Sequence, residues 1–312
     1  LDEHENMHGG AEVKFIVEDE QGKPDTGVTK AKKLILQDKV HMFVGGLLAS
    51  TGYALAPVSS RLKSVYIASI PAADDLTQRD LGKFPYLVRT GWTSSQPSHA
   101  FGEWACQQGY KRIATIAQDY TFGHEQCAGF AQVFTEGGGK IVGQLWNPLN
   151  TADFSPYIGQ LGSMNVDAIF AMELGADATR FMQQYSNFGL KGQIPLLGAQ
   201  NFTDQSVIRT MGEECDGIVS SAHFAEGSDN PETQKFVKAY SAKYGKLPSL
   251  YGFSHYSGAL WVGQVIEQLK GDISNRDAFI DAVLKSELTN SPLGRPVRFD
   301  DYGNPIYDVY IR

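Results

Sequence analysis

Short β-branched apolar segments alternate with segments of helical spacing along most of the chain, and this alternation constrains the fold more than any other feature. Val65–Ala68, Arg112–Gln118 and Ala168–Met172 are typical of the strands. Strands separated by helices of about ten to fifteen residues join through right-handed crossovers and lie parallel. We therefore expect an α/β protein with two doubly wound, parallel-sheet lobes. The expected strands are 12–17, 41–44, 65–68, 112–118, 140–145, 168–172, 195–197, 217–220, 297–300 and 306–311. The expected helices are 28–38, 50–62, 123–137, 154–162, 176–188, 231–244, 250–270 and 276–285.

Two polar segments that contain glycine, Arg89–Ser95 and Ser220–Gly227, mark the expected passages between the lobes. Three helices with no strand between them follow the second segment, so the chain is expected to return there to the first sheet. We expect lobe one to comprise 1–93 and 224–300, and lobe two to comprise 94–223 and 301–312. Leu1–Gly10 is typical of the end of a helix closed by glycine, with no strand before it. The first βα unit of lobe one is therefore expected to be missing.

Composition excludes several classes of function. Hydrophobic residues make up 42% of the 312 residues and charged residues 20%, which suits a packed core. The net charge of −8 argues against binding to nucleic acid or to anionic membrane surfaces. No apolar segment approaches the roughly 20 residues that cross a bilayer, so no membrane insertion is expected, and Leu1–Gly10 is too polar for a signal peptide.

The three cysteines, Cys106, Cys127 and Cys215, have no partner at metal-ligand spacing, so we expect no metal and no cofactor. Cys106 falls on a further expected helix, before the strand 112–118, and Cys127 falls on the next helix, 123–137. A disulfide between them and two separate small apolar residues are both compatible with that placement.

In open parallel sheets, ligands bind beyond the carboxyl ends of the strands, next to helix N-termini. The junction at Val44–Gly52 is the strongest candidate, because two glycines allow close approach and Ser50 or Thr51 can cap the next helix. Leu48 and Ala49 complete this candidate site, where free N–H groups favour an anion such as a carboxylate. An ordinary cap made by Ser50 is the alternative.

Further junctions supply further candidates, and each of them alone is equally compatible with an ordinary loop or cap. Together they predict two rims of polar and aromatic groups, as a ligand cleft requires. The candidates are Ile70 and Ala72 within Ser69–Thr77, Phe122 and His124 within Asp119–His124, Glu173 within Met172–Asp177, and Gln200 within Gly198–Phe202. Motifs of serine hydrolases, nucleotide-binding loops and zinc proteases are absent, and Gly137–Gly139 lies on the wrong side of a strand to bind phosphate, so no enzyme is expected.

The chain resembles the type I periplasmic solute-binding proteins, in particular the leucine/isoleucine/valine-binding receptors of ABC transporters. The segments that carry the resemblance are Val17–Pro24, Val44–Val58, Ile70–Thr77, Val88–Gln96, Asp119–Gly123, Asn187–Leu190 and Phe299–Asn304. The resemblance implies two lobes joined by three crossovers, a ligand in the cleft between them, hinge closure, a periplasmic location and an ABC permease as partner. We also expect a monomer.

Departures from the family pattern bear on the ligand, which we expect to be a small carboxylate or an amino acid. Ala49 stands where a serine commonly holds the ligand carboxylate, Ala72 where a threonine binds the amino-acid head group, and Gln200 where an acid pairs with the ligand ammonium. A buried ammonium without a carboxylate is costly. An aromatic carboxylate is therefore favoured, with Phe122, Tyr251 and Phe253 as walls for its ring.

Two alternatives remain within the same fold. Glu173 or Asp177 could supply the missing negative charge, in which case the ligand is an aliphatic amino acid. The chain could also be a ligand sensor that regulates a partner.

Overall fold

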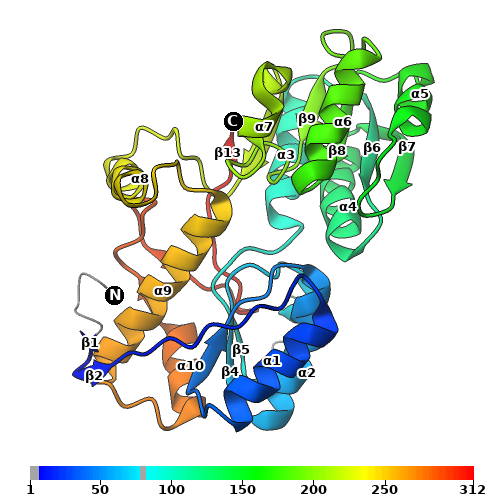
Figure 1. Cartoon of the computed structure of the whole chain (residues 1–312). Coiled ribbons are helices and arrows are strands. Elements are labelled where there is room, and N and C mark those ends of the chain that lie inside the picture. The colour runs from blue at the N-terminus through cyan, green and yellow to red at the C-terminus, as the bar shows by residue number, and fades with distance from the viewer. Residues whose placement is uncertain (1–6, 78–81) are drawn as a thin grey trace. The chain divides into compact units, whose positions relative to one another are not determined.

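The computed structural model describes residues 7–77 and 82–312, which form two compact units (Figure 1). Unit 1 comprises Leu1–Thr93, Ser228–Lys243 and Tyr251–Tyr307. Unit 2 comprises Ser94–Gly227, Tyr244–Leu250 and Asp308–Arg312. Each unit contains a parallel sheet packed against helices, so the expected α/β fold class is confirmed.

The sheet of unit 1 has three parallel strands in the order β3-β4-β5. These are β3 (Met42–Val44), β4 (Val65–Ala68) and β5 (Leu87–Arg89). The central strand β4 is buried along its whole length, as its uninterrupted apolar sequence predicts. Two short antiparallel pairs accompany this sheet, β1 (Met7–His8) with β2 (Ala11–Glu12) and β11 (Glu287–Leu288) with β12 (Val297–Arg298).

The helices described in unit 1 match most of the expected segments closely. They are α1 (Pro24–Leu36), α2 (Ala49–Leu62), α8 (Pro231–Tyr244), α9 (Leu250–Gln268) and α10 (Arg276–Lys285), with a 3-10 turn, η2, at Asp74–Leu76. Helix α1 packs on α2, which contacts β4 and β5, while α10 contacts β5 (Figure 1). Pro24 at the first turn of α1 fits the fixed φ angle of proline and explains why this helix begins before the expected residue 28.

The sheet of unit 2 has six strands in the order β13-β10-β9-β8-β6-β7. All neighbours are parallel except β13, which is antiparallel to β10. The strands are β6 (Arg112–Gln118), β7 (Lys140–Asn147), β8 (Ala168–Met172), β9 (Leu196–Gly198), β10 (Val219–Ala222) and β13 (Tyr310–Ile311). The helices are α3 (Gln96–Gln107), α4 (Thr121–Glu136), α5 (Ser155–Ser163), α6 (Gly175–Asn187) and α7 (Ile208–Met211), followed by η3 (Gly212–Cys215).

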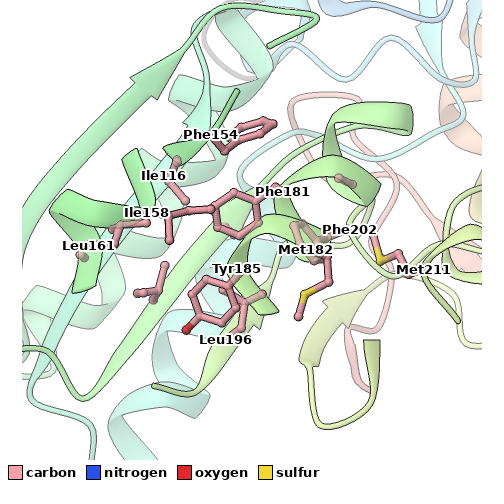
Figure 2. Close-up of a cluster of buried hydrophobic side chains, with 14 of the residues drawn as sticks. Ile116, Phe154, Ile158, Leu161, Phe181, Met182, Tyr185, Leu196, Phe202 and Met211 are labelled. Carbon is pink, nitrogen blue, oxygen red and sulfur yellow. The ribbon is translucent and has the colours of Figure 1, made fainter. Parts of the chain in front are cut away.

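Side chains of β6 and β8 contribute to two separate hydrophobic cores, one on each face of the sheet. One core joins Ile116 of β6 with α5 and α6 and includes Phe154, Phe181 and Phe202 (Figure 2). Aromatic rings of α3 and α4 pack on Phe170 of β8, which points away from that core, as alternation along a strand requires.

The N-terminal region differs most from expectation. The strand expected at 12–17 is present only as Ala11–Glu12, and residues 13–20 have no regular structure. Phe15, Ile16 and Val17 are 65%, 47% and 88% exposed, because no described strand pairs with them. The apolar pattern therefore predicted a strand whose partner the described chain lacks.

The expected helix end over residues 1–10 is wrong where the structure describes it. Met7–His8 forms β1, and Gly9 and Gly10, with φ angles of 56° and 82°, form the turn to β2. Residues 1–6 of that prediction lie outside the described residues.

The units divide the chain at somewhat different residues from the expected lobes. Residues 224–227 and 244–250 group with unit 2, and residues 301–307 group with unit 1. Asn304 accepts a hydrogen bond from Thr77, and the Tyr307 hydroxyl donates to the Thr90 carbonyl at 2.8 Å, which ties this part of the tail to unit 1.

Leu87–Arg89 was not predicted as a strand, because its charged last residue made it resemble the start of a polar crossover. Near the tail, the strand expected at 297–300 is limited to Val297–Arg298, and the strand expected at 306–311 is limited to Tyr310–Ile311. Among the described helices, none combines the length and the apolarity that crossing a membrane requires.

Replacing Phe181 tests the core between the sheet of unit 2 and α5 and α6. Phe181 is fully buried and contacts Phe154, Tyr185 and Phe202. Because truncation leaves a cavity, we expect Phe181→Ala to lower the free energy of unfolding by about 3–5 kcal/mol in urea titrations. Phe188→Ala, at the end of the same helix with a ring that is 50% exposed, should cost less than about 1 kcal/mol. Equal losses in the two variants would contradict this assignment of the core.

Candidate functional site

The start of helix α2 in unit 1 presents unpaired backbone donors. The first hydrogen bond within the helix joins Gly52 N to Leu48 O, so the N–H groups of Ala49, Ser50 and Thr51 have no acceptor in the described chain. Leu48 is the N-cap and has no side chain that could cap the helix. The expectation that Ser50 or Thr51 caps this helix is therefore wrong, since both lie inside its first turn.

Two features before α2 shape this helix start. Gly45 and Gly46 have φ angles of 134° and 81°, which only glycine adopts easily, and they turn the chain from β3 toward the helix. The Gly45 carbonyl accepts a hydrogen bond from the Tyr66 hydroxyl at 3.0 Å, and the Leu47 N–H donates to Glu20 at 3.2 Å. The loop is therefore held from both sides while the helix donors stay unpaired.

Thr51 adds a side-chain group to these donors. It is completely buried, and its Oγ1 has no hydrogen-bond partner among the residues that the structure describes. A buried hydroxyl without a partner costs about 1–3 kcal/mol. Such a group, next to three unpaired N–H groups, suits an anionic acceptor.

The loop after β4 carries Ile70 and Ala72, and both side chains are buried. Ser69, the first residue of this loop, is held by a hydrogen bond between its Oγ and Nδ1 of His255, which are 2.8 Å apart. Burial lowers the pKa of His255, which favours its neutral form.

A buried arginine fixes the same loop, and this was not predicted from the sequence. Arg89, completely buried, donates from Nε to Thr77 Oγ1 at 3.0 Å and from Nη2 to the Ala73 carbonyl at 2.6 Å. Its Nη1 donates to the carbonyls of Pro71 and Trp92 at 3.1 and 3.0 Å. Three carbonyls and a hydroxyl replace water around this charge. The signal in the sequence was a single cation at the end of an apolar strand.

The three aromatic residues expected to line the site have different surroundings. Phe253 is completely buried against Phe236 and Tyr307, both at 6.2 Å between ring centroids, so it belongs to the core of unit 1. Tyr251 is half-buried, with its ring 6.3 Å from that of Trp92.

The corresponding residues of unit 2 are Phe122 and His124, at the start of α4. Phe122 is 5% exposed and lies 6.3 Å from the Tyr120 ring. His124 is exposed, bonds Asp119 Oδ1 at 2.8 Å, and its ring is tilted against that of Trp146 with the centroids 4.0 Å apart. His124 is therefore a surface residue whose side chain contacts Asp119 and Trp146.

Asp177 of α6 already has three partners. Its Oδ2 accepts from Gln118 Nε2 at 2.6 Å and from the Asn150 N–H at 2.8 Å, and its Oδ1 accepts from Arg180. The charge of Asp177 is therefore satisfied within unit 2, and none of it is left over for a ligand ammonium.

Glu173, at the end of β8, is completely buried and has a single hydrogen-bond donor, Asn147 Nδ2, at 3.2 Å. Burial raises the pKa of Glu173 well above its ordinary value, and the nearby Asp177 charge adds to that effect, although the bond from Asn147 opposes it. Burial therefore favours the neutral, protonated form of Glu173.

Gln200, after the end of β9, is completely buried and is hydrogen-bonded to His223, which follows the neighbouring strand β10. Its Oε1 lies 2.9 Å from Nδ1 of His223, and its backbone carbonyl accepts from Arg312 Nη2 at 2.9 Å. Gln200, which was predicted to leave the site without a negative charge, therefore has the guanidinium of Arg312 beside it.

Two expectations concern other chemistry. Cys106, Cys127 and Cys215 are free thiols, and burial raises the pKa of Cys127 to about 12, so this thiol is unreactive. Over the described ranges 7–77 and 82–312, no three histidine, cysteine or acidic side chains gather closely enough to hold a metal ion.

Comparisons with known proteins cover the whole chain. The family model described as periplasmic binding protein matches residues 3–312. The Leu/Ile/Val-binding protein homolog 6 of Brucella melitensis is 29% identical over 316 residues, which covers 99% of this chain and 79% of that protein.

Two solved structures have the same fold over essentially the full chain. An ABC transporter substrate-binding protein from Sphaerobacter thermophilus is 32% identical with a TM-score of 0.92, covering 100% of this chain and 85% of that one. A solute-binding protein of an ABC transporter from Rhodopseudomonas palustris HaA2, in complex with p-hydroxybenzoic acid, is 28% identical with a TM-score of 0.91, covering 99% and 84%.

The buried acid Glu173 predicts a specific pH dependence. Because its pKa is higher in the folded than in the unfolded state, the folded protein binds more protons, and this group's contribution to stability falls as pH rises above the unfolded value of 4.5. Glu173→Gln removes that loss. We expect its stability relative to the natural protein to increase from about pH 5 to pH 8, by at most about 1.4 kcal/mol per pH unit.

Thermal unfolding across this pH range provides the measurement. Glu136→Gln, at an exposed position of α4, is the matched control and should keep the pH profile of the natural protein. A Glu173→Gln profile that runs parallel to the natural one would show that Glu173 is not a buried neutral acid.

Proposed function

The chain belongs to the periplasmic binding protein family, and on that basis we propose that it is the extracytoplasmic receptor of an ABC importer for a small aromatic carboxylate. The observation that carries the choice of ligand is the charge balance at the strand ends. Donors are unpaired at α2, whereas each acidic group considered as a partner for an ammonium is either neutral or already paired.

The ligand carboxylate is assigned to the start of α2. The N–H groups of Ala49, Ser50 and Thr51 and the Thr51 hydroxyl can all donate to it, and the positive end of the helix dipole adds to the attraction. Backbone donors thus compensate for Ala49, which carries no hydroxyl.

An α-amino acid would bring an ammonium group that this chain is poorly equipped to bind. Gln200 supplies no charge, Asp177 is bound by three donors, and Glu173 would have to ionise inside the protein. An uncompensated buried charge costs several kcal/mol. A benzoate-like ligand avoids that cost because its only charge is the carboxylate.

The available contacts are sufficient for tight binding. Two charge-assisted hydrogen bonds contribute about 1.5–3 kcal/mol each. Burial of ~150 Å² of ring surface against groups such as Tyr251 adds roughly 4 kcal/mol at ~25 cal/mol per Å². After ordering costs, micromolar affinity is within reach, at about −8 kcal/mol.

Two comparisons point to different ligands. The Rhodopseudomonas palustris protein was solved with p-hydroxybenzoic acid, which supports an aromatic acid here. The name of the Brucella melitensis relative favours a branched-chain amino acid as the second candidate. We propose in addition that the receptor acts as a monomer, with the importer's permease as its partner and without catalysis.

Calorimetric titration with benzoate and with leucine separates the candidates. We expect micromolar binding of benzoate and none of leucine. Thr51→Val removes one donor while keeping the side-chain volume, so it should weaken benzoate binding about tenfold. Thr29→Val, on the exposed face of α1, is the control and should bind benzoate as the natural protein does. Binding of leucine but not benzoate would refute the ligand assignment.

A further inference from the structure

Gln200 has a donor that the described protein leaves unused. Its side chain is completely buried, and Nε2 has no acceptor in the described ranges, although Oε1 is bonded to His223. Buried polar groups in native proteins are nearly always paired, so an unpaired buried amide requires a partner from outside the chain. An amide N–H donates, and the missing partner is therefore an acceptor.

The amide oxygen of Gln200 faces the neighbouring histidine. Burial lowers the pKa of His223 to about 3, with the Arg312 charge as a smaller cause, so the imidazole is neutral. The Gln200 oxygen can only accept, and Nδ1 of the neutral ring must therefore carry the proton in this bond. The amide oxygen is thereby occupied, and only the N–H donors of Gln200 remain for a ligand.

Arg312 lies beside Gln200 and is held by several partners. Its guanidinium donates to the Gln200 carbonyl and to Thr203 Oγ1 at 2.9 and 3.1 Å, and it lies 3.6 Å from Glu226. The arginine is therefore held in place by its own partners. The Glu226 carboxylate balances the charge of this guanidinium, so the group beside Gln200 is an ion pair.

The position of Gln200 agrees with a role in ligand choice. It lies two residues after the end of β9, and His223 directly follows β10, so the pair stands at the carboxyl ends of two neighbouring parallel strands. Ligands of open parallel sheets bind at that edge.

We propose that Gln200 determines specificity by donating a hydrogen bond to the oxygen of a ring hydroxyl on the aromatic acid. This assignment rests on the proposed function, because it presupposes an aromatic carboxylate. The assignment also extends the proposed function, because it makes a hydroxybenzoate the preferred ligand and unsubstituted benzoate a weaker one. A site that pairs a buried polar group with a ligand hydroxyl discriminates strongly against analogues that lack it.

The first experiment compares ligands of equal shape by calorimetry on the natural protein. The probes are 4-hydroxybenzoate against 4-methylbenzoate, and 3-hydroxybenzoate against 3-methylbenzoate. We expect the hydroxyl compound of at least one pair to bind about tenfold or more tightly. Equal affinities within both pairs would overturn the role of Gln200 while leaving the proposed function intact. Failure of all four compounds and of benzoate would overturn the proposed function, and this inference with it.

The second experiment assigns the preference to the side chain. Gln200→Met keeps the length of the side chain and removes its donors, so the affinity ratio of the preferred pair should fall toward one. Gln200→Asn retracts the same amide by one methylene and should also reduce the ratio, which gives a second test if the methionine variant folds poorly. Gln193→Met makes the same exchange at an exposed position of unit 2 and should keep the natural ratio. An unchanged ratio in a folded Gln200 variant would overturn the assignment.

Discussion

The parallel pairing of the strands is the constraint from which the rest of the structure follows. Parallel strands end at one edge of their sheet, so residues that are distant in the sequence but follow successive strands come together there. In unit 2, Glu173 follows β8, Gln200 follows β9 and His223 follows β10. In unit 1, the glycines before α2 follow β3 and Ser69 follows β4. The same edge therefore carries the polar groups in each unit.

Burial then decides the charge of those groups. The buried carboxylate of Asp177 accepts from two N–H donors and a guanidinium, and Arg89 is tolerated in the interior because three carbonyls and a hydroxyl face it. Glu173 has one amide donor and stays protonated. The preference for a ligand without an ammonium depends on this outcome, because Asp177 is already bonded and burial disfavours the charged form of Glu173.

The elements that sequence analysis predicted best are those whose apolar pattern is complete within one segment. Val65–Ala68, Arg112–Gln118 and Ala168–Met172 have the predicted bounds, as do the helices Pro231–Tyr244 and Arg276–Lys285. Leu87–Arg89 was missed because a three-residue strand that ends in arginine carries too little pattern. Phe15–Val17 has the pattern of a strand but forms none, because a strand also needs a neighbour with which to share its hydrogen bonds.

The sequence by itself determined the α/β class, the order of most strands and helices, and the junctions at which a ligand could bind. These properties depend on local periodicity and on glycine and proline positions, which a chain carries wherever it folds. Only the tertiary structure decided that Asp177 is paired, that Glu173 is neutral, that Phe253 belongs to the core and that Gln200 keeps an unused donor. Hydrogen-bond partners and protonation depend on groups that folding brings from other strands, and no local pattern specifies them.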